Sequence, residues 1–486
     1  MDPETCSEKA STEQNSSPAT QQPLRPGGWA AIAVVIGRIA VWAVLAPPRR
    51  GVRIWAGLRP AQQLVLGFAS YVAIGAALLC LPASRKTDAG WLDHIFTATS
   101  AVSTTGLTTV TVEEAYSFFG QGVILALFQL GGIGYMTLTS ILVLARGGQL
   151  SECRLNVLRA GFALPRYFVM HRFLTHVVVF TLIVETAGAL ILWWRLSVLG
   201  VQGALWSGVF HSVSAFATAG FGLHPRSLEP YAHDPVINGT IAALCYLGAI
   251  GFIVVQDVWY TLRLREWMMT FTSKVVLWTT GAVFALGTIL LLLVEPGVRE
   301  LPWGERIMVC AFQVMTASTT AGFNTIPIGM LSPATLLVII GAMIVGASPS
   351  GTGGGLKTTA VSALWANLLS VLRRRERVTL LGHEVPMPRL LYAAAAACLY
   401  ALLLFVGLIL LVLAEPHGTL PLVFEACSAL GTVGLSMGIT GDLSVTGKWV
   451  LIALMFAGRC GPLTLGLAML RPAAEEPGIR RDDLAI

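Results

Sequence analysis

Four short stretches of this sequence carry residues of the same type at the same spacing. In each stretch a glycine lies ten residues after a phenylalanine, with a serine or threonine four residues after that phenylalanine and an alanine five residues after it. The stretches read FTATSAVSTTGLTT (96–109), FHSVSAFATAGFGL (210–223), FQVMTASTTAGFNT (312–325) and FEACSALGTVGLSM (424–437). Four such copies in one chain indicate a fourfold internal repeat.

The chemistry that this pattern favours is cation coordination by the main chain. A cation that leaves water needs new oxygen ligands, and a ring of backbone carbonyls provides them without burying a fixed charge. Glycine allows the backbone angles that turn carbonyls inward. No carboxylate lies beside these glycines, which favours a monovalent over a divalent cation. We therefore predict one constriction that binds a monovalent cation, built from Thr104, Thr105, Gly106, Thr218, Ala219, Gly220, Thr320, Ala321, Gly322, Thr432, Val433 and Gly434.

Short helices must position these glycines. We expect the residues before each glycine to form a helix whose carboxyl end faces the constriction, where the helix dipole favours a cation. Glycine also ends many helices as a C-cap residue, and a single copy of the pattern would favour that role strongly. Four copies in register favour the constriction.

Long apolar runs flank each of the four stretches. A spanning helix needs about 20 apolar residues, and candidates lie near 62–82, 121–145, 173–199, 237–262, 274–294, 332–347, 390–414 and 448–470. The stretch inside each pair is too short to cross twice, so it must enter the membrane and return. We predict an all-α integral membrane protein with four helix–pore-loop–helix repeats (eight spanning helices) around a single pseudo-fourfold ion pathway.

Composition and charge agree with a membrane protein. Only 12 % of residues are charged and 55 % are hydrophobic, whereas soluble domains carry about 25 % charged residues. This excludes an ordinary soluble enzyme, a disordered protein and a nucleic-acid binder. If the pore loops enter from outside, the inner segments hold 20 of the Lys and Arg residues and the outer segments 7. The positive-inside rule then places the C-terminus in the cytoplasm.

Longer motifs resemble a known family. The stretches QLGGIGYMTL (129–138), GASPSGTGGGLKTT (346–359) and GRCGPLTL (458–465), together with the four repeats, resemble the Trk/Ktr/HKT superfamily of potassium transporters and most closely its Ktr-type membrane subunits. The resemblance covers about 58–470. The chain departs from the family pattern at Ala217 and Thr218, where members often have Asn-Asn.

The resemblance has several implications. It implies potassium uptake through a channel-like pore with one filter glycine per repeat, because sodium-preferring plant members often have serine where Gly106 stands. It also implies a homodimer in the bacterial inner membrane and a cytosolic ring of nucleotide-binding (RCK-type) subunits, with Na⁺ as a candidate coupling ion and no covalent cofactor. The nucleotide is expected only on the partner subunit, and the lipid bilayer is the other partner. A transporter of another monovalent cation, sodium or ammonium, is the alternative. We find no enzyme motif, no nucleic-acid partner and no C-x-x-C pair.

The sixth apolar run is interrupted by a glycine-rich segment. Several glycines and a proline cannot continue a helix, and non-helical backbone at membrane depth must lie within protein or face water. The segment is a candidate gate below the filter, a role that the family resemblance also implies; a hinge at the cytoplasmic surface is the alternative. The candidate gate residues here are Gly351, Gly353, Gly354, Gly355 and Lys357.

Arg459 is the other candidate gate residue. It lies near the middle of the run 448–470, where an arginine costs at least about 2.5 kcal/mol on insertion scales, so it must face water or a partner. Two alternatives stay open: a positive barrier in the ion pathway, or an ion pair with Glu185. The GRCGPLTL context favours the pathway.

The repeats define the domain boundaries. We divide the chain into an N-terminal tail (1–57) in which 29–46 is either a span or an interfacial helix, repeat 1 (58–146), repeat 2 (147–263), repeat 3 (264–388) with its intramembrane loop (346–357), repeat 4 (389–470) and a cytoplasmic tail (471–486).

Overall fold

The computed structural model describes residues 58–134, 170–264 and 269–470. These residues form helices joined by loops, and one antiparallel hairpin of strands β1 (Thr379–Leu380) and β2 (His383–Glu384). The tail at 1–57 with its candidate helix at 29–46, and the tail at 471–486, lie outside the described residues.

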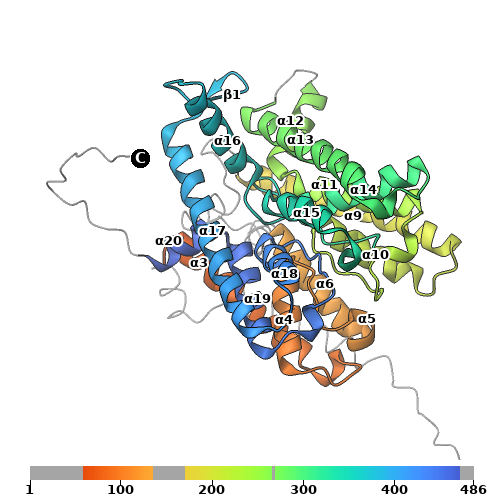
Figure 1. The fold of residues 1–486 in the computed structure, drawn as a ribbon. Coiled ribbons are helices and arrows are strands. Elements are labelled where there is room, and N and C mark those ends of the chain that lie inside the picture. The colour runs from red at the N-terminus through yellow and green to blue at the C-terminus, as the bar shows by residue number, and fades with distance from the viewer. Residues whose placement is uncertain (1–57, 135–169, 265–268, 471–486) are drawn as a thin grey trace, which may run out of the picture. The chain divides into compact units, whose positions relative to one another are not determined.

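Each predicted repeat contributes helices in the same order, as Figure 1 shows. The first is long, the second is short and the third is of intermediate length. The long helices are α3 (Pro60–Leu79), α9 (Met170–Val198), α13 (Phe271–Val294) and α17 (Met387–Ala414). The short helices are α4 (Trp91–Val102), α10 (Ala204–Phe216), α14 (Trp303–Ser318) and α18 (Thr419–Gly431). The third helices are α6 (Phe118–Ile133), α11 (Pro235–Ala249), α15 (Pro333–Ile344) and α19 (Val445–Cys460).

Further helices complete the described part of the chain. They are α5 (Val112–Ala115), α12 (Phe252–Leu264), α16 (Thr358–Leu372) and α20 (Pro462–Met469), with one-turn 3-10 helices η1 (Pro82–Ser84), η2 (Glu229–Tyr231), η3 (Pro296–Val298), η4 (Ile328–Met330) and η5 (Thr440–Asp442). The β-hairpin follows α16 and packs against it (Figure 1).

The long and short helices have opposite surroundings. The four long helices are apolar enough to cross a membrane, yet no more than 33 % of each apolar window is buried inside the protein. In a membrane their exposed apolar faces contact lipid. From its phenylalanine to its last residue, every residue of each short helix is buried. The short helices therefore form the core, and the long helices surround them.

The third helix of each repeat is where the structure differs from eight uninterrupted spans. Helices α11 and α12 form one apolar pair bent by 98°, and α19 and α20 form another bent by 94°. Helices α6 and α15, with 16 and 12 residues, are shorter than a span. Glycines with positive φ angles end three of these helices, namely Gly134, Gly251 and Gly461, because a residue with a side chain adopts that conformation only at a cost.

Polar contacts join the long helices to the third helices. Ser332 and Ser444 cap the N-termini of α15 and α19, and their backbone amides donate to the carboxylates of Glu295 and Glu415, both at 3.0 Å. In the second repeat, Arg195 of α9 forms an ion pair of 2.6 Å with Asp234, the N-cap residue of α11. These contacts fix where each third helix starts.

Candidate ion pathway

The four predicted glycines lie together in a ring. A methyl group on Gly106 would lie 2.6 Å from the carbonyl oxygen of Ala219 and 3.0 Å from Cα of Gly220. The same relation holds between Gly220 and the pair Ala321 and Gly322, again with 2.6 Å to the carbonyl oxygen.

The ring closes through the last repeat. A methyl group on Gly322 would overlap the carbonyl oxygen of Val433, and one on Gly434 would overlap the carbonyl oxygen of Thr105. Each glycine thus touches the next in chain order and the fourth touches the first. We call Gly106, Gly220, Gly322 and Gly434 the glycine ring. Only glycine fits at these four positions, because each Cβ would collide with backbone.

The backbone leading into the ring has the same conformation in all four repeats. The threonine two residues before each glycine is left-handed, with φ between 50° and 56°, and each ring glycine has φ between 67° and 95°. Left-handed threonine is strained. The four threonines are Thr104, Thr218, Thr320 and Thr432.

Backbone hydrogen bonds to the short helices stabilise this left-handed conformation. The amide of the residue before each glycine donates to a carbonyl near the end of the short helix at 2.8–2.9 Å: Thr105 to Ser100, Ala219 to Ser214, Ala321 to Thr316 and Val433 to Ser428. In the first and fourth repeats the hydroxyls of Ser100 and Ser428 also accept from the glycine amides at 3.0 Å. In these two repeats the serine side chain of the sequence pattern supports the ring, whereas the buried hydroxyls of Ser214 and Thr316 have no hydrogen-bond partner among the described residues.

The intramembrane loop (346–357) lies against the same four threonines. Thr352 is its central residue: its hydroxyl lies 3.1 Å from the hydroxyl of Thr218 and donates to the carbonyl of Phe216. The Thr104 hydroxyl lies 3.4 Å from the Thr352 carbonyl. The amide of Gly354 donates to the Thr320 hydroxyl at 3.1 Å.

Two loop glycines are there because nothing larger fits. A methyl group on Gly353 would overlap the hydroxyl of Thr320, and one on Gly354 would overlap that of Thr432. On the other side of the loop, Gly351 packs against the carbonyl of Ala249, and Gly355, with φ of 70°, packs against Gly346. The loop is thus in contact with all four repeats directly beside the glycine ring.

Arg459 and Lys357 bind the loop through its carbonyls. The Arg459 guanidinium donates to the carbonyls of Thr352 and Gly131, and to the hydroxyl of Thr104 at 2.9 Å. Lys357 Nζ donates to the carbonyl of Gly353 at 2.7 Å.

Glu185, the alternative partner of Arg459, is engaged elsewhere. Its carboxyl group accepts from Gln129 Nε2 at 2.9 Å, and the ion pairs found among the described residues do not include Arg459. Of the two alternatives that the sequence left open, the contacts place Arg459 on the loop and beside Thr104, not on Glu185.

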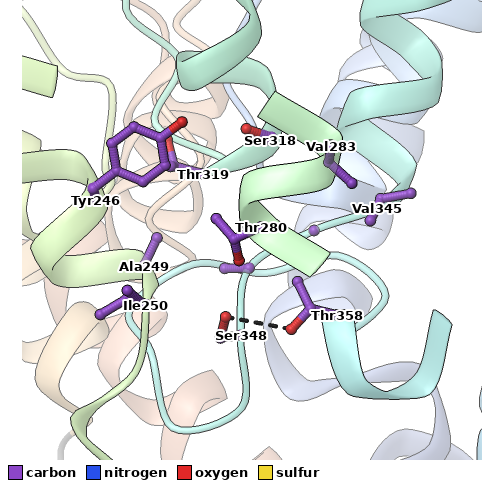
Figure 2. A pocket seen from close by; sticks show the side chains of 12 residues that line it. Tyr246, Ala249, Ile250, Thr280, Val283, Ser318, Thr319, Val345, Ser348 and Thr358 are labelled. Carbon is purple, nitrogen blue, oxygen red and sulfur yellow. Dashed lines mark hydrogen bonds between the residues drawn. The ribbon is translucent and has the colours of Figure 1, made fainter. Parts of the chain in front are cut away.

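A small cavity lies beside the loop (Figure 2). Its volume is about 10 Å³, which is room for about one water molecule. It lies between α11, α13, α14 and the loop, and hydroxyls of Tyr246, Thr280 and Ser348 line it. The Tyr246 and Thr280 hydroxyls are buried and have no protein hydrogen-bond partner among the described residues. The loop therefore has space and unsatisfied polar groups beside it.

Sequence reasoning missed a second set of glycines. Each of these glycines begins a G-x-x-G motif at the end of a third helix: Gly131, Gly248 and Gly458. A methyl group on any of them would overlap a carbonyl oxygen at the carboxyl end of the neighbouring short helix, namely that of Val102, Phe216 or Leu430 respectively. The recurring motifs GGIG, GAIG and GRCG were visible in the sequence. Thr352 was missed too, because a single threonine among glycines has no pattern.

Taken together, these features define a helical membrane protein whose short buried helices converge on one ring of backbone carbonyls. Groups of three or more His, Cys, Asp or Glu side chains that could hold a metal ion are absent from the described ranges.

Comparison with known proteins agrees with this class. The TrkH family, described as "Cation transport protein", matches residues 61–474, and the chain belongs to this family. It is 33 % identical to the Ktr system potassium uptake protein B of Bacillus subtilis over 87 % of this chain and 95 % of that protein. It is 31 % identical to the potassium/sodium uptake protein NtpJ of Enterococcus hirae over 85 % and 93 %. The crystal structure of the potassium transporter TrkH from Vibrio parahaemolyticus is similar in fold, with a TM-score of 0.68 and 19 % identity over 91 % of this chain and 96 % of that one.

Proposed function

We propose that this chain is the membrane subunit of a potassium uptake system, with the glycine ring as its selectivity filter. The observation that carries the proposal is the closed ring, in which each glycine lies against the carbonyl that precedes the next one. Such carbonyls replace the hydration shell of a monovalent cation. The four short helices end at the ring, and their dipoles favour a cation there. The names of the relatives support potassium as that cation.

Within this proposal the intramembrane loop is the gate. The loop contacts the four threonines beside the ring, Lys357 Nζ donates to the loop carbonyl of Gly353, and the positive charge of Arg459 opposes the passage of a cation. Opening requires the loop to leave these contacts.

Sodium is the second candidate ion. The name of the Enterococcus hirae relative includes sodium, which favours Na⁺ as a coupling or competing ion. The name "Ktr system" supports a partner subunit; a homodimer and a cytosolic nucleotide-binding ring are the assembly that we propose, in the inner membrane of a bacterium with the C-terminus in the cytoplasm.

Growth rescue tests the function. A potassium-uptake-deficient bacterial strain at low external potassium receives the chain, alone and with a Ktr-type cytosolic subunit, and rubidium uptake is measured with sodium and ammonium as competitors. We expect rescue by the unaltered chain, and loss of rescue or altered sodium competition in Gly106→Ser, Gly220→Ser, Gly322→Ser and Gly434→Ser.

The matched control is Gly341→Ser in α15, where added atoms meet open space. It should behave as the unaltered chain. Normal rescue by well-expressed ring variants would show that the glycine ring is not the selectivity filter. Stronger competition by ammonium or sodium than by potassium would show that potassium is not the preferred ion.

A further inference from the structure

One position on the short helices lies between the helix and the segment that leaves the ring. This segment is irregular backbone that follows each ring glycine, and we call it the outgoing strand. It is the residue directly after the phenylalanine of the pattern, and in the second, third and fourth repeats it is His211, Gln313 and Glu425. All three side chains are buried, with exposures of 3 %, 0 % and 0 %.

Each of these side chains contacts the residue three positions after its ring glycine. His211 Nε2 lies 3.4 Å from the amide nitrogen of Leu223. Gln313 Nε2 donates to the Thr325 hydroxyl at 3.2 Å. In the fourth repeat, the amide of Met437 donates to Glu425 Oε1 at 3.1 Å. The same position therefore holds the same outgoing strand in three repeats.

Glu425 holds its strand more firmly than the other two. Besides the Met437 amide, its carboxylate accepts from the Ser436 hydroxyl at 2.5 Å and the Thr440 hydroxyl at 2.9 Å. Both carboxylate oxygens are thus used, and all donors come from the strand 436–440. His211 and Gln313 each make one such bond, so the segment of the fourth repeat is held by the most hydrogen bonds.

The anchored strand is continuous with the ring. Ser436 follows Gly434 by two residues, and the carbonyl of Val433 lies against Gly322 while Gly434 lies against Thr105. A shift of the strand moves those carbonyls, and discrimination between cations of different size depends on the positions and number of the carbonyls.

We propose that Glu425 is a positioning residue for ion selectivity: its carboxylate anchors the strand after Gly434 and so fixes the carbonyls of the fourth repeat for potassium. The inference rests on the proposed filter. It assigns to Glu425 no contact with the ion.

Two substitutions of Glu425 test the proposal in cells or proteoliposomes that take up rubidium. Glu425→Ala removes every bond to the strand, whereas Glu425→Gln keeps the Oε1 acceptor and the side-chain length. We expect the alanine variant to lose at least about tenfold of its preference for rubidium over sodium, equivalent to about 1.4 kcal/mol between the two barriers. The glutamine variant should retain most of the preference. In the alanine variant the KM for rubidium should change more than the maximal uptake rate per molecule.

Glu415→Gln is the matched control. Glu415 is also buried, and it also accepts from a serine amide and hydroxyl, those of Ser444 at 3.0 and 2.6 Å, but Ser444 is the N-cap residue of α19 and does not belong to the segment 436–440. This variant should change the yield or thermal stability and leave the cation preference unaltered.

The outcomes separate the alternatives. Unchanged preference in Glu425→Ala overturns the proposal, as does an equal loss in both Glu425 variants, which would indicate fixed charge instead of position, or an equal loss in the Glu415 control. If Glu425→Ala does not reach the membrane, Ser436→Ala and Thr440→Val each remove one donor and decide the question by the same ratio. Gly106→Ser is measured in parallel. If neither Gly106→Ser nor Glu425→Ala changes the preference, the proposed filter is wrong. If Gly106→Ser changes it and Glu425→Ala does not, only the proposed role of Glu425 is wrong.

Discussion

Arg459 is a charged residue that contacts both the loop and the first repeat. Arg459 lies in the G-x-x-G motif of the fourth repeat, at the position that Gly132 and Ala249 occupy in the first two. Its guanidinium has no carboxylate partner among the described residues and donates to carbonyls and to Thr104 instead. A cation bonded only to neutral groups keeps its full charge, which then acts on a nearby ion.

We expect Arg459→Gln to raise the rate of rubidium uptake. Glutamine can still donate to a carbonyl but carries no charge, so the barrier falls, and each 1.4 kcal/mol of lowering is about tenfold in rate. The preference over sodium should stay, because the glycine ring is unaltered. Initial rates per molecule of protein in the membrane measure this.

Arg306→Gln is the control for that substitution. Arg306 donates to the carbonyl of Leu292 and stacks on Trp303, away from the loop. Unchanged uptake in Arg459→Gln, with a lowered protein yield, would show that Arg459 is a structural anchor and not a barrier.

At the scale of elements, the intramembrane loop and the third helices are both held by close backbone contacts. The loop reaches across the chain to Thr104, more than 200 residues away, and to Thr218. The third helices approach the short helices through glycines that leave no room for a side chain. The proposed gate and the third helices are thus held by the same kind of close contact, and the loop adds the side-chain hydrogen bonds of Thr352.

Thr352→Val should loosen the loop. The substitution keeps the shape but removes the hydroxyl that bonds to Phe216 and Thr218, and each lost bond costs about 1 kcal/mol. We expect faster rubidium uptake with the same preference over sodium. Thr240→Val, which removes a hydroxyl bonded within its own helix, should leave uptake unaltered; an equal effect of both variants would contradict the gate.

Gly458→Ala should destabilise the scaffold. A methyl group there would overlap the carbonyl of Leu430, and overpacking of this kind costs about 1–3 kcal/mol. The thermal unfolding midpoint in detergent should fall. Gly122→Ala in α6 meets open space and should match the unaltered protein or exceed it slightly, since alanine favours helix. A midpoint unchanged by Gly458→Ala would mean that the helices can separate without cost.

At the scale of the whole molecule, one sequence pattern accounts for the order of the helices. The spacing from phenylalanine to glycine predicted the four short helices, because the same local bonds, such as Thr105 to Ser100, form in each copy. Composition and apolar runs predicted a helical membrane protein. The bends after α11 and α19 were not predicted, because hydropathy continues through Gly251 and Gly461 while the helix axis does not.

The contacts of the candidate gate were only partly predictable. Glycine and proline at 346–355 predicted irregular backbone, but the contacts of Thr352 with Thr218 and of Gly354 with Thr320 arise from tertiary packing. For the same reason the sequence did not decide whether Arg459 faces the ion pathway or pairs with Glu185. The contacts of Arg459 with the loop and Thr104 are visible only in the packed structure.

Membrane topology gives the prediction for the whole chain. After replacement of the native cysteines, Glu300→Cys, in the exposed turn after η3, and Glu376→Cys, in the exposed basic run after α16, serve as two reporters. The excess of positive charge on the inner segments predicts that a membrane-impermeant maleimide labels position 300 in intact cells and position 376 only after permeabilisation. The reverse labelling pattern would show that the chain has the opposite orientation in the membrane, with the pore loops entering from the cytoplasm.

The central claim is that the four glycines form one cation-binding ring, and the position of a bound ion tests it most directly. Crystals of the protein grown in rubidium would be measured at the rubidium absorption edge, with an anomalous difference map as the readout. The account predicts a peak enclosed by the carbonyls of Thr105, Ala219, Ala321 and Val433, which is absent when rubidium is replaced by sodium. A well-ordered ring with no rubidium peak, or a peak elsewhere in the molecule alone, would contradict it.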